Sequence, residues 1–178
     1  MNPEIESEEV LRKRLQSRSL PVLLVQIGIC SAIFWAVFGA NLRHSWDLHR
    51  LNRALNATAH PANSRLVSQG QEVGLLIRNG DHCDFFVGEL RSFRGTQSGI
   101  KKFYSQSKIW NPLNNTSQPL EIMFLQNGKI PASKQEYLPS GFDSVSRGSK
   151  SPLNTKQHYY LLYFFDVGYD ADFDWRCL

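Results

Sequence analysis

The feature that most constrains this chain is an apolar segment of 23 residues, Leu20–Leu42, which contains no Asp, Glu, Lys, Arg or His. A helix of this length extends about 35 Å, and the hydrocarbon core of a bilayer is about 30 Å thick. We therefore predict a transmembrane helix. A cleaved signal peptide is the alternative. The run is longer than the roughly 7 to 15 residues of a signal-peptide core, and a long Glu-rich segment precedes it, so an uncleaved signal anchor is favoured.

The apolar segment divides the chain into four expected parts. They are a charged tail at 1–19, the transmembrane helix at 20–42, a juxtamembrane helix at 43–60, and a β-rich extracytoplasmic domain at 61–178 with a flexible loop at 128–157. The loop is expected because this stretch is rich in proline, glycine and serine. The fold class we expect is α+β: a single transmembrane helix that continues into a short stalk helix, then a small, mainly antiparallel β domain.

The juxtamembrane segment has the pattern of a helix that leaves the membrane. It contains no glycine or proline, and Leu48, Leu51 and Leu55 follow helical spacing. Trp46 suits the headgroup region, where amphipathic aromatic side chains collect. The leucines can seed a short coiled-coil stalk or pack on the domain that follows, and their small number favours packing.

Basic residues near the span set the expected orientation. Four Lys or Arg residues precede it within 1–19, and three follow it within 43–60. The more basic side of a span usually faces the cytoplasm. We therefore expect a single-pass protein of the cell membrane with a cytoplasmic N-terminus. Within the tail, a short charged helix is expected to end before Pro21.

The cysteines agree with export of the domain. Cys30 lies inside the apolar run, which leaves Cys83 and Cys177 as one pair in the soluble part. Because disulfides persist in oxidising compartments, we expect a Cys83–Cys177 bond, with two reduced thiols as the alternative. His82 and Asp84 flank Cys83, but no signature of a cysteine-dependent enzyme surrounds this thiol.

The domain has strand-like runs separated by turn signals. Two such runs, 72–78 and 83–93, flank Asn79-Gly80, which is a strong signal for a hairpin. Further strands are expected at 120–126 and 158–167, and the second of these is the most hydrophobic run of the domain, typical of a central strand.

Some local features of the domain are more ambiguous. The segment 99–110 fits either a strand or a short helix. Gly88 is expected to mark a β-bulge within its strand. Glu89 and Arg91 point to the same side of that strand, so we expect an ion pair on its exposed face.

Small residues recur at every fourth position of the predicted span, at Gly28, Ala32, Ala36 and Ala40. Such a stripe allows two helix backbones to approach closely in lipid. We treat it as a candidate association face, with membrane lipid around it and either another membrane protein or a second copy of this chain as partner. Chance spacing is the alternative, because both residue types are common in membrane helices.

The C-terminal segment carries four closely spaced carboxylates, Asp166, Asp170, Asp172 and Asp174. Alternating carboxylates occur in calcium loops, where hard oxygen ligands converge on one cation. Trp175 stands where such a loop requires its turn glycine. These aspartates are therefore weak metal candidates, and the favoured interpretation is the polar face of a strand.

The remaining features exclude more functions than they indicate. The net charge of +4 is spread along the chain without a concentrated basic patch, so nucleic-acid binding is not expected. No catalytic, cofactor or metal motif is present, and none of these groups is expected. The sequence predicts a non-catalytic, membrane-anchored interaction or assembly subunit. The alternative is a membrane-tethered domain that binds a small ligand or metal, or an enzyme, through the C-terminal aspartates and the 128–157 loop.

Overall fold

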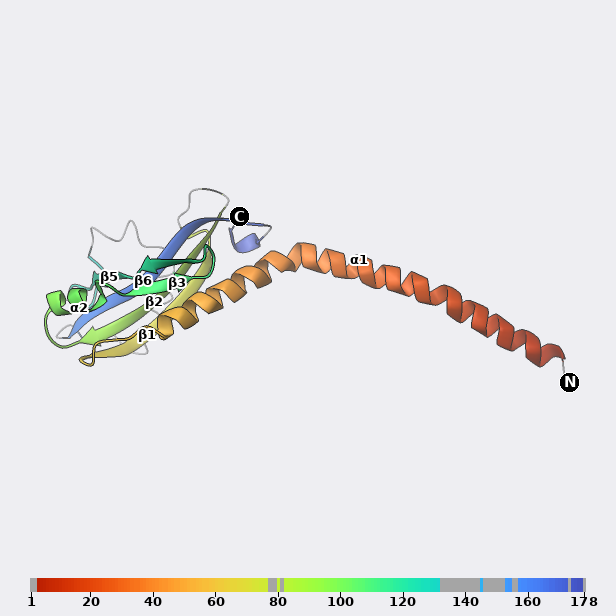
Figure 1. Ribbon diagram of the computed structural model, residues 1–178, viewed down its shortest axis with the longest axis horizontal. Coiled ribbons are helices and arrows are strands. Elements are labelled where there is room, and N and C mark those ends of the chain that lie inside the picture. The colour runs from red at the N-terminus through yellow and green to blue at the C-terminus, as the bar shows by residue number, and fades with distance from the viewer. Residues whose placement is uncertain are drawn as a thin grey trace. The chain divides into compact units, whose positions relative to one another are not determined.

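The computed structural model describes residues 3–76, 80, 82–131, 145, 153–154, 157–172 and 174–177. The chain forms two compact units, Met1–Gly39 and Ala40–Leu178. In the described part the fold is α+β, with a long N-terminal helix, two short helices and a mainly antiparallel sheet, as expected from the sequence (Figure 1).

Helix α1 (Pro3–Asn56) runs through both units. It continues past Pro21, so the expectation of a separate tail helix ending before this proline is wrong. A proline in a helix removes one backbone donor, and α1 continues on both sides of the lost hydrogen bond. Between residues 21 and 35 every side chain is exposed, although most of them are apolar.

The structure gives partial support for a membrane span. No single helix of the described part is long and apolar enough to qualify by itself. The two parts of α1 on either side of a bend, Pro21–Trp35 and Phe38–Asn56, meet the length and composition criteria only when they are taken together.

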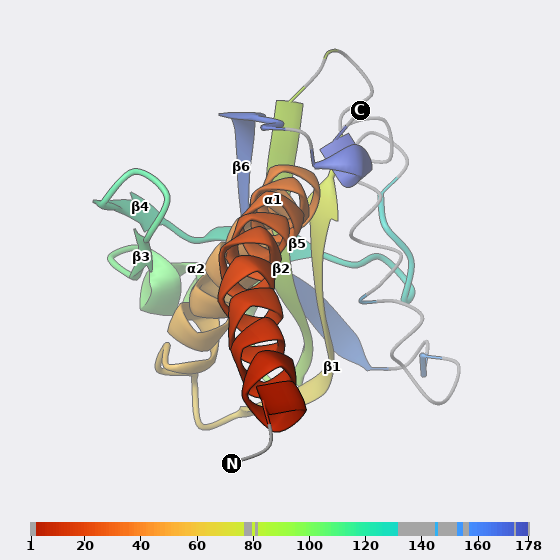
Figure 2. The same ribbon diagram turned by 90° about the vertical axis from the view of Figure 1, so that its right-hand side faces the viewer.

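The second unit is built on a four-stranded antiparallel sheet in the order β1-β2-β6-β5. A smaller antiparallel pair, β3-β4, and the short helix α2 complete the second unit (Figure 2). The elements are β1 (Ser64–Gly74), β2 (His82–Phe93), α2 (Gln97–Tyr104), β3 (Lys108–Asn111), β4 (Thr116–Pro119), β5 (Glu121–Phe124), β6 (His158–Asp170) and the 3-10 helix η1 (Trp175–Cys177).

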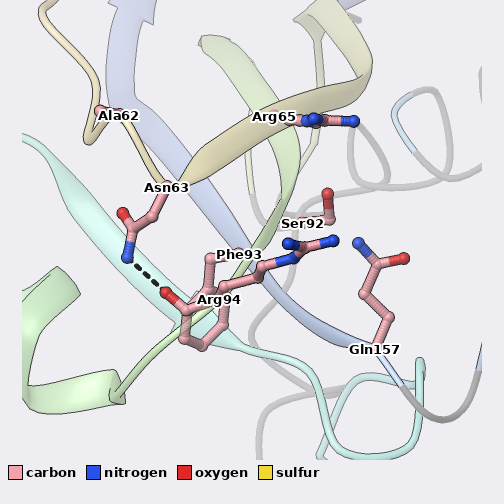
Figure 3. Close-up of a pocket in the computed structure, with 7 residues that line it drawn as sticks. All are labelled: Ala62, Asn63, Arg65, Ser92, Phe93, Arg94 and Gln157. Carbon is pink, nitrogen blue, oxygen red and sulfur yellow. Dashed lines mark hydrogen bonds between the residues drawn. The ribbon is translucent and has the colours of Figure 1, made fainter.

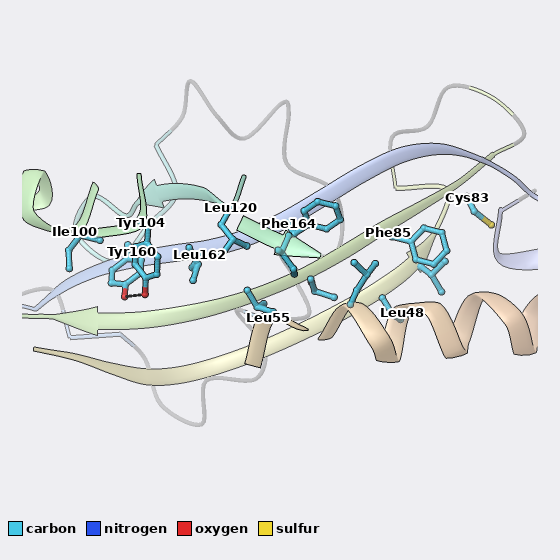
Figure 4. Close-up of a cluster of buried hydrophobic side chains, with 14 of the residues drawn as sticks. Leu48, Leu55, Cys83, Phe85, Ile100, Tyr104, Leu120, Tyr160, Leu162 and Phe164 are labelled. Atoms are coloured by element: carbon cyan, nitrogen blue, oxygen red, sulfur yellow. Dashed lines mark hydrogen bonds between the residues drawn. The ribbon is translucent and has the colours of Figure 1, made fainter. Parts of the chain in front are cut away.

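The leucines of the juxtamembrane segment pack on the domain. Leu51 and Leu55 are fully buried, and Leu48 is nearly so. They join the cluster formed by one face of β2 and β6, with Phe85 and Leu162 among its members (Figure 4). The Ala40–Asn56 part of α1 is therefore a core element of the domain, and packing is the correct alternative for these leucines.

The opposite face of the sheet is also covered. Phe86, Leu90 and Leu161 lie in a second buried cluster. Val145 belongs to this cluster and is fully buried, and its carbonyl accepts a hydrogen bond from Ser68 Oγ at 2.7 Å. Most of the predicted 128–157 loop lies outside the described residues.

The predicted hairpin pairing is confirmed, because β1 and β2 are antiparallel neighbours. Asn79 itself lies outside the described residues. The ambiguous 99–110 segment contains both alternatives, since α2 ends at Tyr104 and β3 begins at Lys108. Thr96 caps α2 by accepting a hydrogen bond from the Gly99 N–H.

Gly88 is not in a bulge, contrary to the prediction from sequence. The register shifts lie between Leu66 and Ser68 and between Cys83 and Phe85. A Cβ at Gly88 would lie 2.8 Å from Phe86 Cζ. The glycine therefore makes room for the aromatic ring that crosses it, while the strand remains regular.

Candidate functional site

A buried polar site lies where α1 meets the C-terminal segment. After β6 the chain turns at Asp172, whose φ is +45°, and η1 follows beside α1 (Figure 1). Cys177 in η1 is bonded to Cys83 in β2, so the predicted disulfide is present. The backbone N–H of Leu75 donates to the Arg176 carbonyl at 3.0 Å, which places this segment at the end of β1. We call the contacts between residues 41–45 and residues 172–177 the junction.

Asp174 is the centre of the junction and is fully buried. Its Oδ2 accepts hydrogen bonds from His44 Nδ1 at 2.9 Å and from Arg176 Nη2 at 2.6 Å. Its Oδ1 accepts from the backbone N–H of Arg176 at 3.1 Å and from Nε at 2.9 Å. Burial alone would raise the pKa of Asp174, but the hydrogen bonds from Arg176 and His44 outweigh it and hold the pKa below 3.8. The carboxylate is therefore ionised at neutral pH.

The His44 ring has a defined orientation. It is 2% exposed and packs edge-on against Phe85. Arg43 Nη2 lies 3.2 Å from Nε2 of the ring. Because a guanidinium can only donate, Nε2 accepts this bond and Nδ1 carries the proton that is donated to Asp174. Cys83 Sγ lies 3.2 Å from the same Nδ1, so the imidazole connects α1 to the disulfide as well as to the C-terminal segment.

Further contacts complete the junction at its surface. Arg43 forms an ion pair with Asp172. Arg176 donates from Nη1 to Ser45 Oγ at 3.1 Å and from Nη2 to the Asn41 carbonyl at 3.0 Å. An exposed ion pair contributes up to about 1 kcal/mol to the free energy of unfolding. The buried contacts of Asp174 therefore contribute most to the attachment of α1 to the C-terminal segment.

The junction and Cys83 together contain four residues of types that bind metals. Ligand atoms of His44, Cys83, Asp174 and Cys177 lie within 4.8 Å of one another, and all four residues are buried. A zinc site would require free thiolates. Here the two sulfurs are bonded to each other, and Arg176 neutralises Asp174. In the disulfide form this group is therefore a structural core. Cys83 is also not available as the nucleophilic thiol considered beside His82 and Asp84.

The C-terminal aspartates do not converge on one cation. Asp170 is exposed at the end of β6, Asp172 pairs with Arg43, and Asp174 is buried in the junction. In the described part, Asp174 is the only one of the four aspartates that belongs to a cluster of possible metal ligands, whose other members are His44, Cys83 and Cys177. The interpretation of 170–175 as a strand with one polar face is wrong, because β6 ends at Asp170, Asp172 is in a turn and η1 begins at Trp175.

Asp166 has a separate role, in β6 where this strand passes β3. Its carboxylate accepts hydrogen bonds from Asn111 Nδ2 at 2.6 Å and from the Tyr169 hydroxyl. Burial and the bond to Asp166 raise the pKa of Tyr169 to about 12. This carboxylate therefore ties β3 to β6.

Glu89 and Arg91 form the predicted ion pair, at 2.7 Å, but both are buried. The prediction of an exposed pair is wrong because α1 and α2 cover this face of β2. Glu89 Oε2 also lies 3.5 Å from His60 Nε2. Nδ1 of His60 lies 2.9 Å from the Tyr104 hydroxyl, which in turn lies 3.0 Å from that of Tyr160. These five side chains form one polar network beyond the C-terminal end of α1, in which His60 is partly exposed and the other four are buried.

The predicted association face remains accessible where it is described. Ala32 is exposed, Ala40 is half-buried, and a Cβ added at Gly28 would have no neighbour within 4 Å. The Ala36 side chain lies outside the described part.

The sequence gives no signal for His44 or Arg176, which contribute most of the donors in the junction. Each lies near a predicted feature, but their approach to Asp174 depends on the tertiary fold. No family model, curated protein or solved structure matches this chain. The fold and the junction are therefore interpreted from their geometry alone.

Proposed function

We propose that this protein is a non-catalytic, single-pass subunit that anchors an extracytoplasmic domain to the cell membrane and acts by interaction or assembly, with its N-terminus in the cytoplasm. The observation that carries the proposal is a single helix that is apolar and exposed in one unit and belongs to the core of the other. An apolar surface of this extent is stable in lipid or against another apolar helix.

The exposed fractions of the apolar side chains support this proposal. Val25, Ile27 and Trp35 are exposed by 62%, 56% and 62%, and they lie on several sides of the helix. A helix at the surface of a soluble domain has one apolar face and one polar face. A helix that is apolar all round is suited to the hydrocarbon core of a membrane.

Two tryptophans support a membrane next to the junction. Trp46 and Trp175 are 66% and 71% exposed. Both belong to the second unit and lie close to the residues where α1 enters that unit. Tryptophan is enriched where lipid meets water, because its ring is apolar and its N–H is polar. Arg43 nearby is suited to lipid phosphates.

Within the second unit, the first residues of α1 are held to the C-terminal segment, because His44 donates to Asp174 and Arg176 donates to the Asn41 carbonyl. The part of α1 that begins the domain is therefore a fixed element of it.

Cysteine labelling of the full chain in intact cells tests the topology. In a Cys30→Ser background, Lys102→Cys should react with a membrane-impermeant maleimide, and Ser7→Cys should react only after the membrane is opened. Wild-type Cys30 should remain protected until detergent is added. Reaction of Ser7→Cys before Lys102→Cys would contradict the orientation, and rapid labelling of Cys30 in intact membranes would contradict the span.

Co-purification tests the association face. Two differently tagged copies, or a tagged copy with its partner, should be recovered together from mild detergent. Ala32→Leu with Ala36→Leu should reduce recovery, because the larger side chains prevent close approach of the backbones. The matched control is Ile27→Leu, which keeps the volume on the opposite side of the helix. Equal recovery of all three forms would contradict association through this face.

A further inference from the structure

A polar pocket lies at the end of the domain that is opposite to the junction. It has a volume of about 280 Å³ and is lined by Ala62, Asn63, Arg65, Ser92, Phe93, Arg94 and Gln157 (Figure 3). This volume is at the small end of the range of about 300 to 1,000 Å³ that is usual for ligand pockets. It is suited to a small polar molecule.

The strand register explains why these residues meet. Arg65 on β1 is paired with Ser92 on β2, so their side chains are on the same face of the sheet. Arg94 follows Ser92 by two positions, and Gln157 precedes Tyr159 by two, which continues the same face beyond the strand ends. This is the face that carries the second buried cluster, and the pocket lies where that cluster stops.

The pocket has a fixed frame. The backbone N–H of Arg94 donates to the Asn63 carbonyl at 3.1 Å, and Asn63 Nδ2 donates to the Arg94 carbonyl. Phe93 is 3% exposed and packs against Phe124 and Tyr160, so the floor is part of the core. The two arginines thus extend from backbone that is held in place.

The polar groups available in the pocket are mainly donors. Both guanidinium groups can only donate, and no carboxylate is among the described lining residues. The Tyr159 hydroxyl donates to Oε1 of Gln157 at 3.4 Å, which leaves the amide NH₂ of Gln157 for the pocket (Figure 3). No ion pair joins Arg65 or Arg94 to a carboxylate in the described part of the chain. Two unneutralised cations around one cavity favour an anion.

We propose that this pocket binds the phosphate group of a small soluble molecule, with Arg65 and Arg94 as the charged donors and Gln157 and Ser92 as neutral ones. Guanidinium groups bind phosphate oxygens through paired, charge-assisted hydrogen bonds. Lipid phosphates share this chemistry. Ala62 and Asn63 of the pocket follow the C-terminal end of α1. This end of the helix is about 25 Å from Ala40, where α1 enters the domain, so a soluble ligand is favoured over a lipid headgroup.

The test uses the full chain in nanodiscs of neutral phosphatidylcholine, with inorganic phosphate as the probe and chloride to keep the ionic strength constant. The midpoint of thermal unfolding should rise with phosphate concentration, because a ligand that binds the folded state stabilises it. Arg65→Gln and Arg94→Gln should each weaken the apparent affinity about tenfold or more, the loss expected for one charged hydrogen bond. Lys108→Gln removes the same charge from an exposed position on β3 and should leave the affinity unchanged.

Gln157→Glu provides an independent test that leaves both arginines in place. The new carboxylate should pair with them, raise the unfolding midpoint without phosphate, and abolish the response to phosphate. The proposal is overturned if the wild type shows no saturable response, or if the Arg65→Gln, Arg94→Gln double variant responds like the wild type. A response to nanodiscs containing phosphatidic acid, with none to inorganic phosphate, would overturn the assignment to a soluble ligand.

Discussion

His44 and Asp174 are 130 positions apart in the chain, yet His44 Nδ1 donates to Asp174 Oδ2 at 2.9 Å in a site where both side chains are buried. The same carboxylate binds Arg176, whose guanidinium reaches back to the Asn41 carbonyl of α1. One buried charge thus organises the attachment of the helix to the C-terminal segment, and its removal is expected to affect both.

Asp174→Asn should lower the free energy of unfolding by about 3 kcal/mol, because it leaves the Arg176 charge without its partner in a buried site. Asp170→Asn is the matched control, since Asp170 is exposed on the preceding strand, and it should change stability by less than about 0.5 kcal/mol. Denaturant unfolding of the full chain in detergent measures both. Equal effects of the two substitutions would contradict the central role of Asp174.

The same residue predicts an acid transition. The pKa of Asp174 in the folded protein lies below its ordinary value of 3.8, so the unfolded chain binds a proton more readily. Its contribution is fully present above about pH 4 and is lost as the pH falls through the folded-state pKa. The stability difference between wild type and Asp174→Asn should therefore shrink between pH 4 and pH 2. A constant difference across this range would contradict the prediction.

Loss of the Cys83–Cys177 bond should cost about 4 to 5 kcal/mol, because it closes a loop with a sequence separation of 94 residues. The double substitution to serine is compared with Cys30→Ser, which removes the free cysteine of the described chain. Thermal unfolding measures the difference. Thiol titration of the denatured protein should find one reactive cysteine before reduction and three after it. Three thiols before reduction would exclude the bond in the isolated protein.

His60 predicts a second pH dependence in a different range. Burial is the main reason that its pKa lies below 6.5; it outweighs the attraction of Glu89, and Arg91 lowers the pKa further. Because the unfolded chain binds the proton more readily, stability should fall as the pH drops from about 6.5 through the folded-state pKa. His60→Gln should remove this slope, whereas His49→Gln, on the exposed side of α1, should keep it. An NMR titration of His60 with a midpoint above 6.5 would reverse the sign.

Gly88→Ala should destabilise the domain by about 1 to 3 kcal/mol, since its Cβ would overlap the buried ring of Phe86. The overlap predicts non-additivity. In a Phe86→Leu background the ring is gone, and the same alanine should cost less than it does in the wild type. A double-mutant cycle measured by denaturant unfolding checks this, and strict additivity would exclude the steric explanation.

Local patterns in the sequence predict much of the domain. The spacing of Leu48, Leu51 and Leu55 indicates a helical face, and that face is buried. The turn signal at Asn79-Gly80 indicates the pairing of β1 with β2. These features succeed because helix and strand periodicity depend on neighbours a few residues away.

Contacts between distant segments cannot be predicted in this way. Glu89 and Arg91 have the pattern of a solvent-facing pair, and only the fold shows that α1 and α2 cover them. A glycine within a strand is typical of a bulge, which is why the sequence predicts one at Gly88. The sequence does not show that the Phe86 ring lies over this position, which is the reason for the glycine in the fold. The phosphate pocket likewise depends on the pairing of Arg65 with Ser92, and this register appears only when the strands are aligned.

The arrangement of the junction has a consequence for the order of folding during synthesis. Residues 41–45 emerge early, whereas their partners at 172–177 follow about 130 positions later. Until those partners have been synthesised, residues 41–45 lack these polar contacts, and contacts of such long range form slowly. The oxidised junction is therefore a chemical mark of a chain that has been synthesised through Cys177 and has brought this residue beside Cys83.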